Sequence, residues 1–144
     1  MIPVKIIKSP GAVIPEYKTK NAAGADIYSF LQEDVIIGPG EVKLIPTGIS
    51  IELPPGYEAQ IRPRSGLAVK HGISLLNSPG TIDADYRGEI KIIMINSGTE
   101  NFTVTNHMRI AQMIFAKVYS GMFIETEILN ESNRGEGGFG HTGI

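Results

Sequence analysis

Arg64 and Ser65 are the residues of this chain whose types and order most directly suggest anion binding. They stand at the expected start of a short helix, in which Ser65 is the N-cap, residues 67–70 form the turns and Gly72 ends the helix. Unpaired N–H groups and the helix dipole favour an anion at such a terminus. A capped helix beside an exposed arginine is also an ordinary structural feature, and the motif alone favours that interpretation.

Asp83 and Tyr86 lie in a polar, turn-rich segment, 77–89, that precedes a strongly apolar stretch. Such a segment is typical of a hairpin or a bend at the rim of a sheet. Asp83 could activate a water as a general base, or it could form a D-x-D metal pair with Asp85. An isolated D-x-D is more commonly a solvated turn. Tyr86 could pack against a sugar ring or belong to the core.

Asp26 is a carboxylate within a segment of small and apolar residues, 21–27. A carboxylate in apolar surroundings needs a partner or a function. A structural hydrogen bond is the more common outcome, and the small neighbours would let the backbone pack closely.

The last fifteen residues, 130–144, are rich in glycine and include Arg134 and Phe139. They match G-x-G-x-x-G and, apart from His141, the P-loop pattern, but both folds need a helix after the motif and only two residues follow it. The local chemistry remains: glycine N–H groups and a guanidinium suit phosphates, and a phenyl ring suits a base. We expect a mobile arm that acts as a nucleotide lid, although a floppy terminus fits the composition equally well.

The composition excludes several classes of protein. The 144 residues suffice for about one domain, and a net charge of −2 gives no strong positive field for stable nucleic-acid binding. The absence of cysteine excludes disulfides, thiolate metal sites and a cysteine nucleophile. No apolar run reaches the roughly 18 residues of a membrane helix, and the first residues lack a signal-peptide pattern. We therefore expect a soluble, cytoplasmic protein without a membrane partner.

Most of the chain has the pattern of short β-strands separated by glycine and proline. The segments 38–41 and 54–56 are predicted as hairpin turns between their flanking strands. The two most apolar strands, 89–95 and 109–118, are expected to be buried on both faces. This spacing favours a β-sandwich or barrel with one short helix. The expected strands are 35–37, 42–45, 49–53, 57–62, 89–95 and 109–118.

Five sequence blocks, in order, resemble the five motifs of the trimeric dUTP pyrophosphatases (dUTPases). The resemblance covers essentially the whole chain, and its one visible departure is His141, where many members carry serine. The blocks are AAGADIY at 22–28, PRSGLA at 63–68, NSPGTIDADYRGE at 77–89, RIAQMIF at 109–115 and RGEGGFGHTG at 134–143.

The resemblance implies an all-β, jelly-roll-like β-barrel over residues 1–129 and a flexible arm, 130–144, that closes over the active site. It implies a homotrimer whose three sites lie at subunit interfaces and whose Mg²⁺ is held by the triphosphate and water, without direct protein ligands. The implied reaction is hydrolysis of dUTP to dUMP and pyrophosphate, which limits uracil in DNA and supplies dUMP for thymidylate synthesis. The alternatives are a dCTP deaminase or a non-catalytic nucleotide-binding member of the superfamily; a coat-like structural protein would leave the arm unexplained.

The resemblance also assigns the residues of the site. Asp83 would accept a proton from the water that attacks the α-phosphorus, and Asp26 would anchor waters around the metal or hold a structural network. The implied phosphate-binding residues are Arg64, Ser65, Gly66, Gln112, Arg134, Gly140 and Thr142. Asn77 and backbone groups at Gly80, Thr81 and Ile82 would recognise uracil. Tyr86 would press on the deoxyribose and exclude a ribose, and Phe139 would stack on the base.

Overall fold

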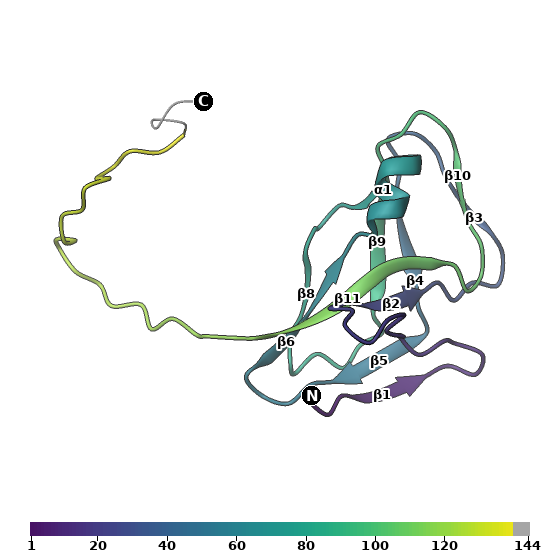
Figure 1. Ribbon diagram of the computed structural model, residues 1–144, viewed down its shortest axis with the longest axis horizontal. Coiled ribbons are helices and arrows are strands. Elements are labelled where there is room, and N and C mark those ends of the chain that lie inside the picture. Colours follow the sequence, from purple (N-terminus) through teal and green to yellow (C-terminus); the bar gives the residue numbers. More distant parts are fainter. Residues whose placement is uncertain (140–144) are drawn as a thin grey trace.

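The computed structural model describes residues 1–139 and consists of short strands with a single short helix in that part of the chain (Figure 1). This confirms the all-β class predicted from the sequence. The elements are β1 (Lys5–Lys8), β2 (Ala25–Tyr28), β3 (Val35–Ile37), β4 (Val42–Pro46), β5 (Ile49–Glu52), β6 (Tyr57–Arg62), α1 (Ser65–His71), β7 (Ile73–Leu75), β8 (Gly80–Ile82), β9 (Lys91–Asn96), β10 (Phe102–Val104) and β11 (Arg109–Lys117).

The strands pair into four antiparallel sheets. The largest has the order β2-β11-β6-β8, a second has the order β4-β9-β7, and two ribbons are formed by β1 with β5 and by β10 with β3. The pairing described for residues 1–139 does not by itself close a barrel. Almost every paired strand meets a partner from a distant part of the sequence, so the fold depends on long-range contacts.

Both predicted hairpins are wrong in their pairing. The segments 38–41 and 54–56 are turns, but β3 pairs with β10 while β4 pairs with β9, and β5 pairs with β1 while β6 pairs with β11 and β8. The first turn does not form a hairpin because its backbone is hydrogen-bonded to β9. The Gly40 N–H donates to the Asn96 carbonyl, and the Asn96 N–H donates to the Glu41 carbonyl. Each turn therefore carries the chain from one sheet to another.

The core is formed by alternate residues of the strands. Ile92, Met94 and Asn96 of β9 are buried, whereas Ile93 and Ile95, which alternate with them, are only partly covered. The expectation that β9 and β11 are buried on both faces is therefore wrong for the single chain. Their second faces are mostly apolar and partly open to solvent. The largest fully buried side chains include Ile27, Ile37, Ile45, Ile49, Ile73, Ile90, Ile110 and Met113.

Helix α1 differs from its prediction at one end. Its N-cap is Arg64, whose backbone is extended and whose carbonyl accepts hydrogen bonds from the Leu67 and Ala68 N–H groups. Ser65 is the first helical residue, not the cap, so its exposed hydroxyl is not committed to capping. The other end is as predicted, because Gly72 ends the helix in the left-handed conformation at φ +67°.

Beyond β11 the chain runs away from the body as an extended segment, 118–139 (Figure 1). Its large apolar side chains are strongly exposed, among them Tyr119, Met122, Phe123, Ile124, Ile128 and Leu129. Within residues 1–139, no helix is long and apolar enough to cross a membrane.

Candidate functional site: two residue groups on opposite parts of one chain

Asp83 and Tyr86 line a pocket of about 430 Å³ beside the end of β8. Thr81 and Ile82 contribute from β8, and the far wall is apolar, formed by Leu44 of β4 and Ile93 of β9. Asp83 is exposed at this pocket, so a water or a polar ligand can reach its carboxylate. We call Thr81, Ile82, Asp83 and Tyr86 the hairpin group.

The segment before the pocket is shaped for close backbone approach. Gly80 is buried opposite Ile61 of β6, and a Cβ added there would lie 3.0 Å from Nδ2 of Asn77. Asn77 and Gly80 therefore lie side by side, although neither lines the pocket itself. Because β8 is the edge of its sheet, its outer side presents backbone groups that a flat, hydrogen-bonding ligand can pair with.

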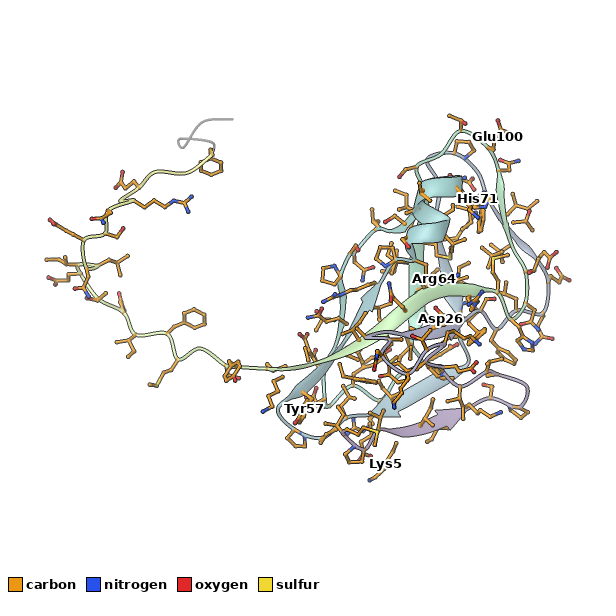
Figure 2. All side chains as sticks on the ribbon, viewed as in Figure 1. Lys5, Asp26, Tyr57, Arg64, His71 and Glu100 are labelled. Carbon is orange, nitrogen blue, oxygen red and sulfur yellow. The ribbon has the colours of Figure 1, made fainter. Side chains whose placement is uncertain are left out.

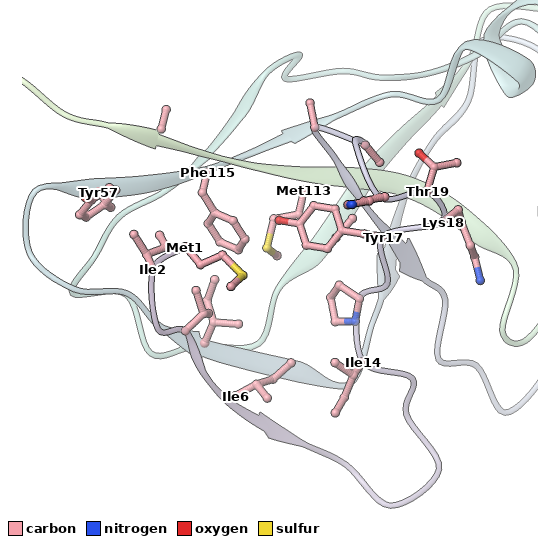
Figure 3. A pocket seen from close by; sticks show the side chains of 18 of the residues that line it. Met1, Ile2, Ile6, Ile14, Tyr17, Lys18, Thr19, Tyr57, Met113 and Phe115 are labelled. Atoms are coloured by element: carbon pink, nitrogen blue, oxygen red, sulfur yellow. The ribbon is translucent and has the colours of Figure 1, made fainter.

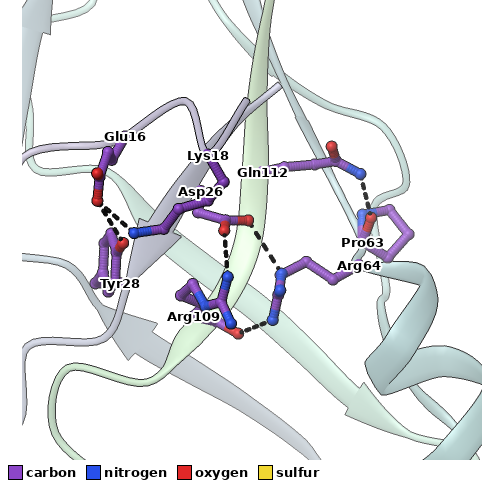
Figure 4. A network of polar contacts seen from close by, with 8 residues as sticks. All are labelled: Glu16, Lys18, Asp26, Tyr28, Pro63, Arg64, Arg109 and Gln112. Atoms are coloured by element: carbon purple, nitrogen blue, oxygen red, sulfur yellow. Dashed lines mark hydrogen bonds and ion pairs between the residues drawn. The ribbon is translucent and has the colours of Figure 1, made fainter. Parts of the chain in front are cut away.

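A second group of polar residues is built around Asp26 (Figure 4). Its Oδ1 accepts a hydrogen bond from Nε of Arg64 at 3.1 Å, and its Oδ2 accepts one from Nη1 of Arg109 at 3.0 Å. Arg64 also donates from Nη1 to the Arg109 carbonyl at 3.0 Å. The Asp26 side chain is only 14% exposed. Two guanidinium groups against one carboxylate leave a net positive charge, which suits an anion.

Gln112 lies at the edge of this cluster. Its Nε2 donates to the Pro63 carbonyl at 3.0 Å, which connects β11 to the segment before α1. A Cβ at Gly24 would collide with the Gln112 side chain, so the small residues predicted to allow close packing do so here. We call Asp26, Arg64, Arg109 and Gln112, with the exposed Ser65 and Gly66 that follow Arg64, the arginine group.

Glu16 and Lys18 form an exposed ion pair next to Asp26 (Figure 4). The hydrogen bond from Lys18 lowers the pKa of the Glu16 carboxyl, and the same bond raises the pKa of Lys18. Tyr28 adds a hydrogen bond to Glu16 at 3.3 Å, and Lys18 lies 5.7 Å from the Tyr28 ring centre. Because the charges of Glu16 and Lys18 cancel, this ion pair does not change the net positive charge of Asp26, Arg64 and Arg109 together.

The hairpin group and the arginine group do not meet within one chain. Ile82 is opposite Ala59 of β6, and Asp83 continues from there toward Tyr57, whereas Arg64 follows the other end of β6. At about 3.3 Å per strand residue, Asp83 and Arg64 are separated by roughly 15–20 Å along β6. A single copy therefore holds the two groups apart.

The tail residues lie apart from both groups. Arg134 donates from Nε to the Gly137 carbonyl at 2.7 Å, and Phe139 is exposed with φ +50°. Both belong to the segment that runs away from the body (Figure 1). Gly140 and Thr142 lie outside the described residues.

A second hollow was not predicted. It is an apolar groove of about 970 Å³ between the start of the chain and β11 (Figure 3). Met1, Ile6, Tyr17, Met113 and Phe115 are among its lining residues. No residue assigned a role from the sequence lines it.

Sequence reasoning gave no role to three residues that the structure brings to the two groups. Arg109 pairs with Asp26, Arg87 donates from Nη1 to the Ala84 and Tyr86 carbonyls, and Glu89 accepts the Tyr86 hydroxyl. In the sequence, the one feature that could have pointed to these three residues is that each is charged and stands at or near the start of an apolar strand. Figure 2 shows Asp26 and Arg64 close together in the whole molecule.

An exposed carboxylate at a pocket and a separate pair of arginines define a β-protein suited to a small phosphorylated ligand. The chain belongs to the dUTPase family, whose sequence model matches residues 11–143. It is 60% identical over 131 residues to the deoxyuridine 5'-triphosphate nucleotidohydrolase of Thermoanaerobacter sp. (strain X514), covering 91% of this chain and 88% of that protein. It is 55% identical over 146 residues to the enzyme of the same name from Rickettsia prowazekii (strain Madrid E), covering 100% and 99%.

The fold also matches solved dUTPase structures. The Staphylococcus bacteriophage 80alpha dUTPase with dUPNHPP superposes with a TM-score of 0.89 at 26% identity, covering 99% of both chains. The jelly-roll-like architecture expected from the resemblance is thereby confirmed. No cluster of three or more His, Cys, Asp or Glu side chains that could hold a metal occurs within residues 1–139.

Proposed function

We propose that this protein hydrolyses dUTP to dUMP and pyrophosphate. The observation that carries the proposal is the exposed Asp83 carboxylate at a pocket that is also lined by the edge strand β8, by Tyr86 and by apolar side chains of β4 and β9, in a chain of the dUTPase family. In the cell this reaction would limit uracil in DNA and supply dUMP.

Asp83 is the general base of the proposed mechanism. It orients a water and accepts its proton while the water oxygen attacks the α-phosphorus in line and pyrophosphate leaves. A positioned carboxylate of this kind contributes typically a hundredfold or more. No covalent intermediate is required, because positioning and charge stabilisation supply most of the catalysis of phosphate transfer.

The arginine group supplies the phosphate contacts, through Arg64, the Ser65 hydroxyl, Gly66 and Gln112. Because this group lies roughly 15–20 Å from Asp83 in one chain, it acts on the substrate held by a neighbouring copy. The role of Asp26 that its contacts favour is the structural one, since both of its oxygens accept hydrogen bonds from arginines.

This division of the site requires an oligomer, which we propose is a homotrimer. Two apolar surfaces support contacts between copies: the groove of Figure 3 and the exposed side chains of 118–129. Exposed apolar surface of this extent marks an interaction site. A third candidate surface is the outer face of β4 and β9, where Val42 and Leu44 are exposed and Ile93 and Ile95 are partly covered.

Uracil is recognised at the edge strand β8. Backbone groups at Gly80, Thr81 and Ile82, with the Asn77 amide, supply the donor and acceptor that the uracil edge needs. Cytosine presents the reversed pattern and would leave buried groups unpaired. Tyr86 covers the deoxyribose and leaves no room for a 2′-hydroxyl.

The arm, 130–144, closes the site. Arg134 binds the γ-phosphate, Phe139 stacks on uracil, and Gly140 and Thr142 complete the phosphate contacts. Within residues 130–139 the side-chain hydrogen bonds are local, from Arg134 to Gly137 and from Gly135 to Ser132, which is compatible with movement of this part of the arm to the site.

Mg²⁺ is the proposed cofactor, carried by the triphosphate. The residues fit a metal that is held by the triphosphate and not by protein ligands. Both oxygens of Asp26 accept hydrogen bonds from arginines. Asp83 and Asp85 are exposed, and within residues 1–139 they form no cluster with a third metal-ligating side chain. Bound Mg²⁺ would neutralise phosphate charge while keeping most of its waters. The cytoplasmic location stays a prediction.

The proposal is tested with Asp83→Asn in a pyrophosphate-release assay. We expect turnover of dUTP to fall by roughly a hundredfold or more while binding of a non-hydrolysable dUTP analogue persists. Asp85→Asn is the matched control, because it removes a second exposed carboxylate two residues away and should leave turnover unchanged. Normal turnover by Asp83→Asn would refute the assignment. Ammonia release from dCTP would instead support the deaminase alternative.

A further inference from the structure

Glu89 anchors the turn that carries Tyr86. The Tyr86 hydroxyl donates to the Glu89 carbonyl at 3.0 Å, and Oε1 of the Glu89 side chain accepts a hydrogen bond from the Gly48 N–H at 2.9 Å. The Lys91 ammonium lies 3.6 Å from the other carboxylate oxygen. One residue therefore connects the pocket turn to the turn between β4 and β5, 41 positions away in sequence.

Gly48 is a rigid partner for this bond. Its φ of +66° favours glycine, and an added Cβ would lie 2.7 Å from the Phe30 ring and 2.8 Å from Ala12. Its carbonyl also accepts a hydrogen bond from the Ser9 N–H at 2.8 Å. The position of Glu89 is thus fixed by a part of the fold that is tightly packed.

Tyr86 is held from two further sides. A Cβ at Gly88 would collide with the Tyr86 ring and hydroxyl, so the ring lies directly over Gly88. Arg87 donates from Nη1 to the Ala84 carbonyl at 2.7 Å and to the Tyr86 carbonyl at 2.9 Å, which closes the turn. With its hydroxyl bound at Glu89, the ring has one orientation at the pocket.

We propose that Glu89 is a positioning residue that sets the discrimination between deoxyribose and ribose by holding Tyr86 in place through Gly48. The inference rests on the proposed function, in which Tyr86 covers the sugar. Loss of the Gly48 bond lets the segment 86–89 shift, and the ring then admits a 2′-hydroxyl that it otherwise excludes.

The experiment measures kcat/KM for dUTP and for UTP by pyrophosphate release from the full-length protein. Glu89→Ala removes the acceptor for the Gly48 N–H, and we expect the dUTP-to-UTP ratio to fall roughly tenfold, since small misplacements in a site have effects of this size. Glu89→Gln keeps an acceptor oxygen of the same reach and should retain the ratio. A merely structural role would lower both activities together and leave the ratio constant.

The chain offers a closely matched control in Glu41→Ala. The Glu41 carboxylate accepts a hydrogen bond from the Gly38 N–H at 2.9 Å and has Lys43 at 3.7 Å, which are contacts of the same kind as those of Glu89, but they lie within its own turn and Glu41 does not line the pocket. It should leave the ratio unchanged. If it lowers the ratio as Glu89→Ala does, the selectivity effect is not specific to Glu89.

Tyr86→Phe provides the second test. It removes the hydroxyl that binds the Glu89 carbonyl, so it should lower the same ratio, and combining it with Glu89→Ala should lower the ratio by less than the product of the single effects. An unchanged dUTP-to-UTP ratio in Glu89→Ala would overturn the inference. If Glu89→Ala does not fold, the same ratio is measured in Glu89→Asp, whose side chain is too short to reach Gly48. A wild-type protein that releases no pyrophosphate from dUTP would instead refute the proposed function.

Discussion

Asp26 shows how one carboxylate can position two cations. It holds the Arg64 and Arg109 guanidinium groups at 3.1 and 3.0 Å while being largely buried. Without it, the two positive groups would lose the carboxylate that both of them contact. The arrangement of the arginine group therefore depends on the Asp26 carboxylate, which in the proposed mechanism need not touch the substrate.

We expect Asp26→Ala to lower the free energy of unfolding by about 1–3 kcal/mol, because it leaves charged donors without their acceptor. Urea unfolding followed by circular dichroism measures this change. Asp26→Asn keeps one carbonyl acceptor and should cost less. Equal stability of Asp26→Ala and the wild type would mean that the network contributes nothing to folding.

At the scale of residues, the sequence predicted that Asp26 needs a counter-group, but it did not predict which residue supplies it. An acidic residue among small neighbours requires a counter-group, yet Arg109 is 83 positions from Asp26, and a contact over that separation follows from strand pairing alone. Glu89 was missed for the same reason, since its partner is a backbone N–H of a distant turn.

At the scale of elements, Asn96 at the end of β9 connects two loops. It is fully buried; its Nδ2 donates to the Ile37 and Glu100 carbonyls, each at 2.8 Å, and its Oδ1 accepts the Gly98 N–H at 2.9 Å. Every polar atom of the side chain is satisfied, so the residue orders the ends of β3 and β10 without a desolvation cost.

We expect Asn96→Ala to lower the free energy of unfolding by about 2–3 kcal/mol, because it leaves buried carbonyl and N–H groups unpaired. Thermal and urea unfolding measure the loss. The exposed Asn101→Ala is the control and should change stability little. Comparable effects of the two substitutions would contradict the role of Asn96.

The pairing of β1 with β5 should depend on pH through Glu52. The hydrogen bond from Lys5 lowers the pKa of Glu52 in the folded state, so the pair stabilises the fold above the pH at which a free glutamate titrates. This contribution is lost as pH falls through the lowered pKa. The melting temperatures of the wild type and Lys5→Met should therefore differ near neutrality and converge at acid pH. A difference that grows on acidification would contradict this.

The strands were largely predictable from alternation and turn residues, whereas their partners were not. The residues 38–41 do form a turn, but hairpin chemistry is local and cannot reveal that Gly40 and Glu41 bond to Asn96 instead. Ser65 was predicted as the N-cap of α1 from its residue type alone. The N-cap is Arg64, one residue earlier, because the backbone of Arg64 is extended.

At the scale of the whole molecule, the arm should be separable from folding. Truncation after Ser132 removes residues whose described hydrogen bonds are local, so we expect an unchanged melting temperature and oligomeric state but little dUTP hydrolysis. Differential scanning calorimetry and solution mass measurement test the first two. Unfolding on truncation would show that the arm is part of the scaffold.

The sequence predicted a set of site residues but not that these residues fall into two groups within one chain. Their order along the chain is compatible with one cluster, and only the register of β8 on β6 separates Asp83 from Arg64. The apolar groove and the exposed side chains of 118–129 were likewise invisible to motif reasoning, because apolar residues are expected inside a β-protein.

The most direct test of the account mixes two inactive variants. Asp83→Asn and Arg64→Ala chains, carried on different tags, are co-expressed, and oligomers that contain both are isolated and assayed for pyrophosphate release from dUTP. If neighbouring copies complete each site, every mixed trimer carries one site with both native residues, so roughly a third of the sites in the isolated mixed trimers are restored, although each variant alone is inactive. Mixed oligomers that form, remain folded and stay inactive would contradict the shared site.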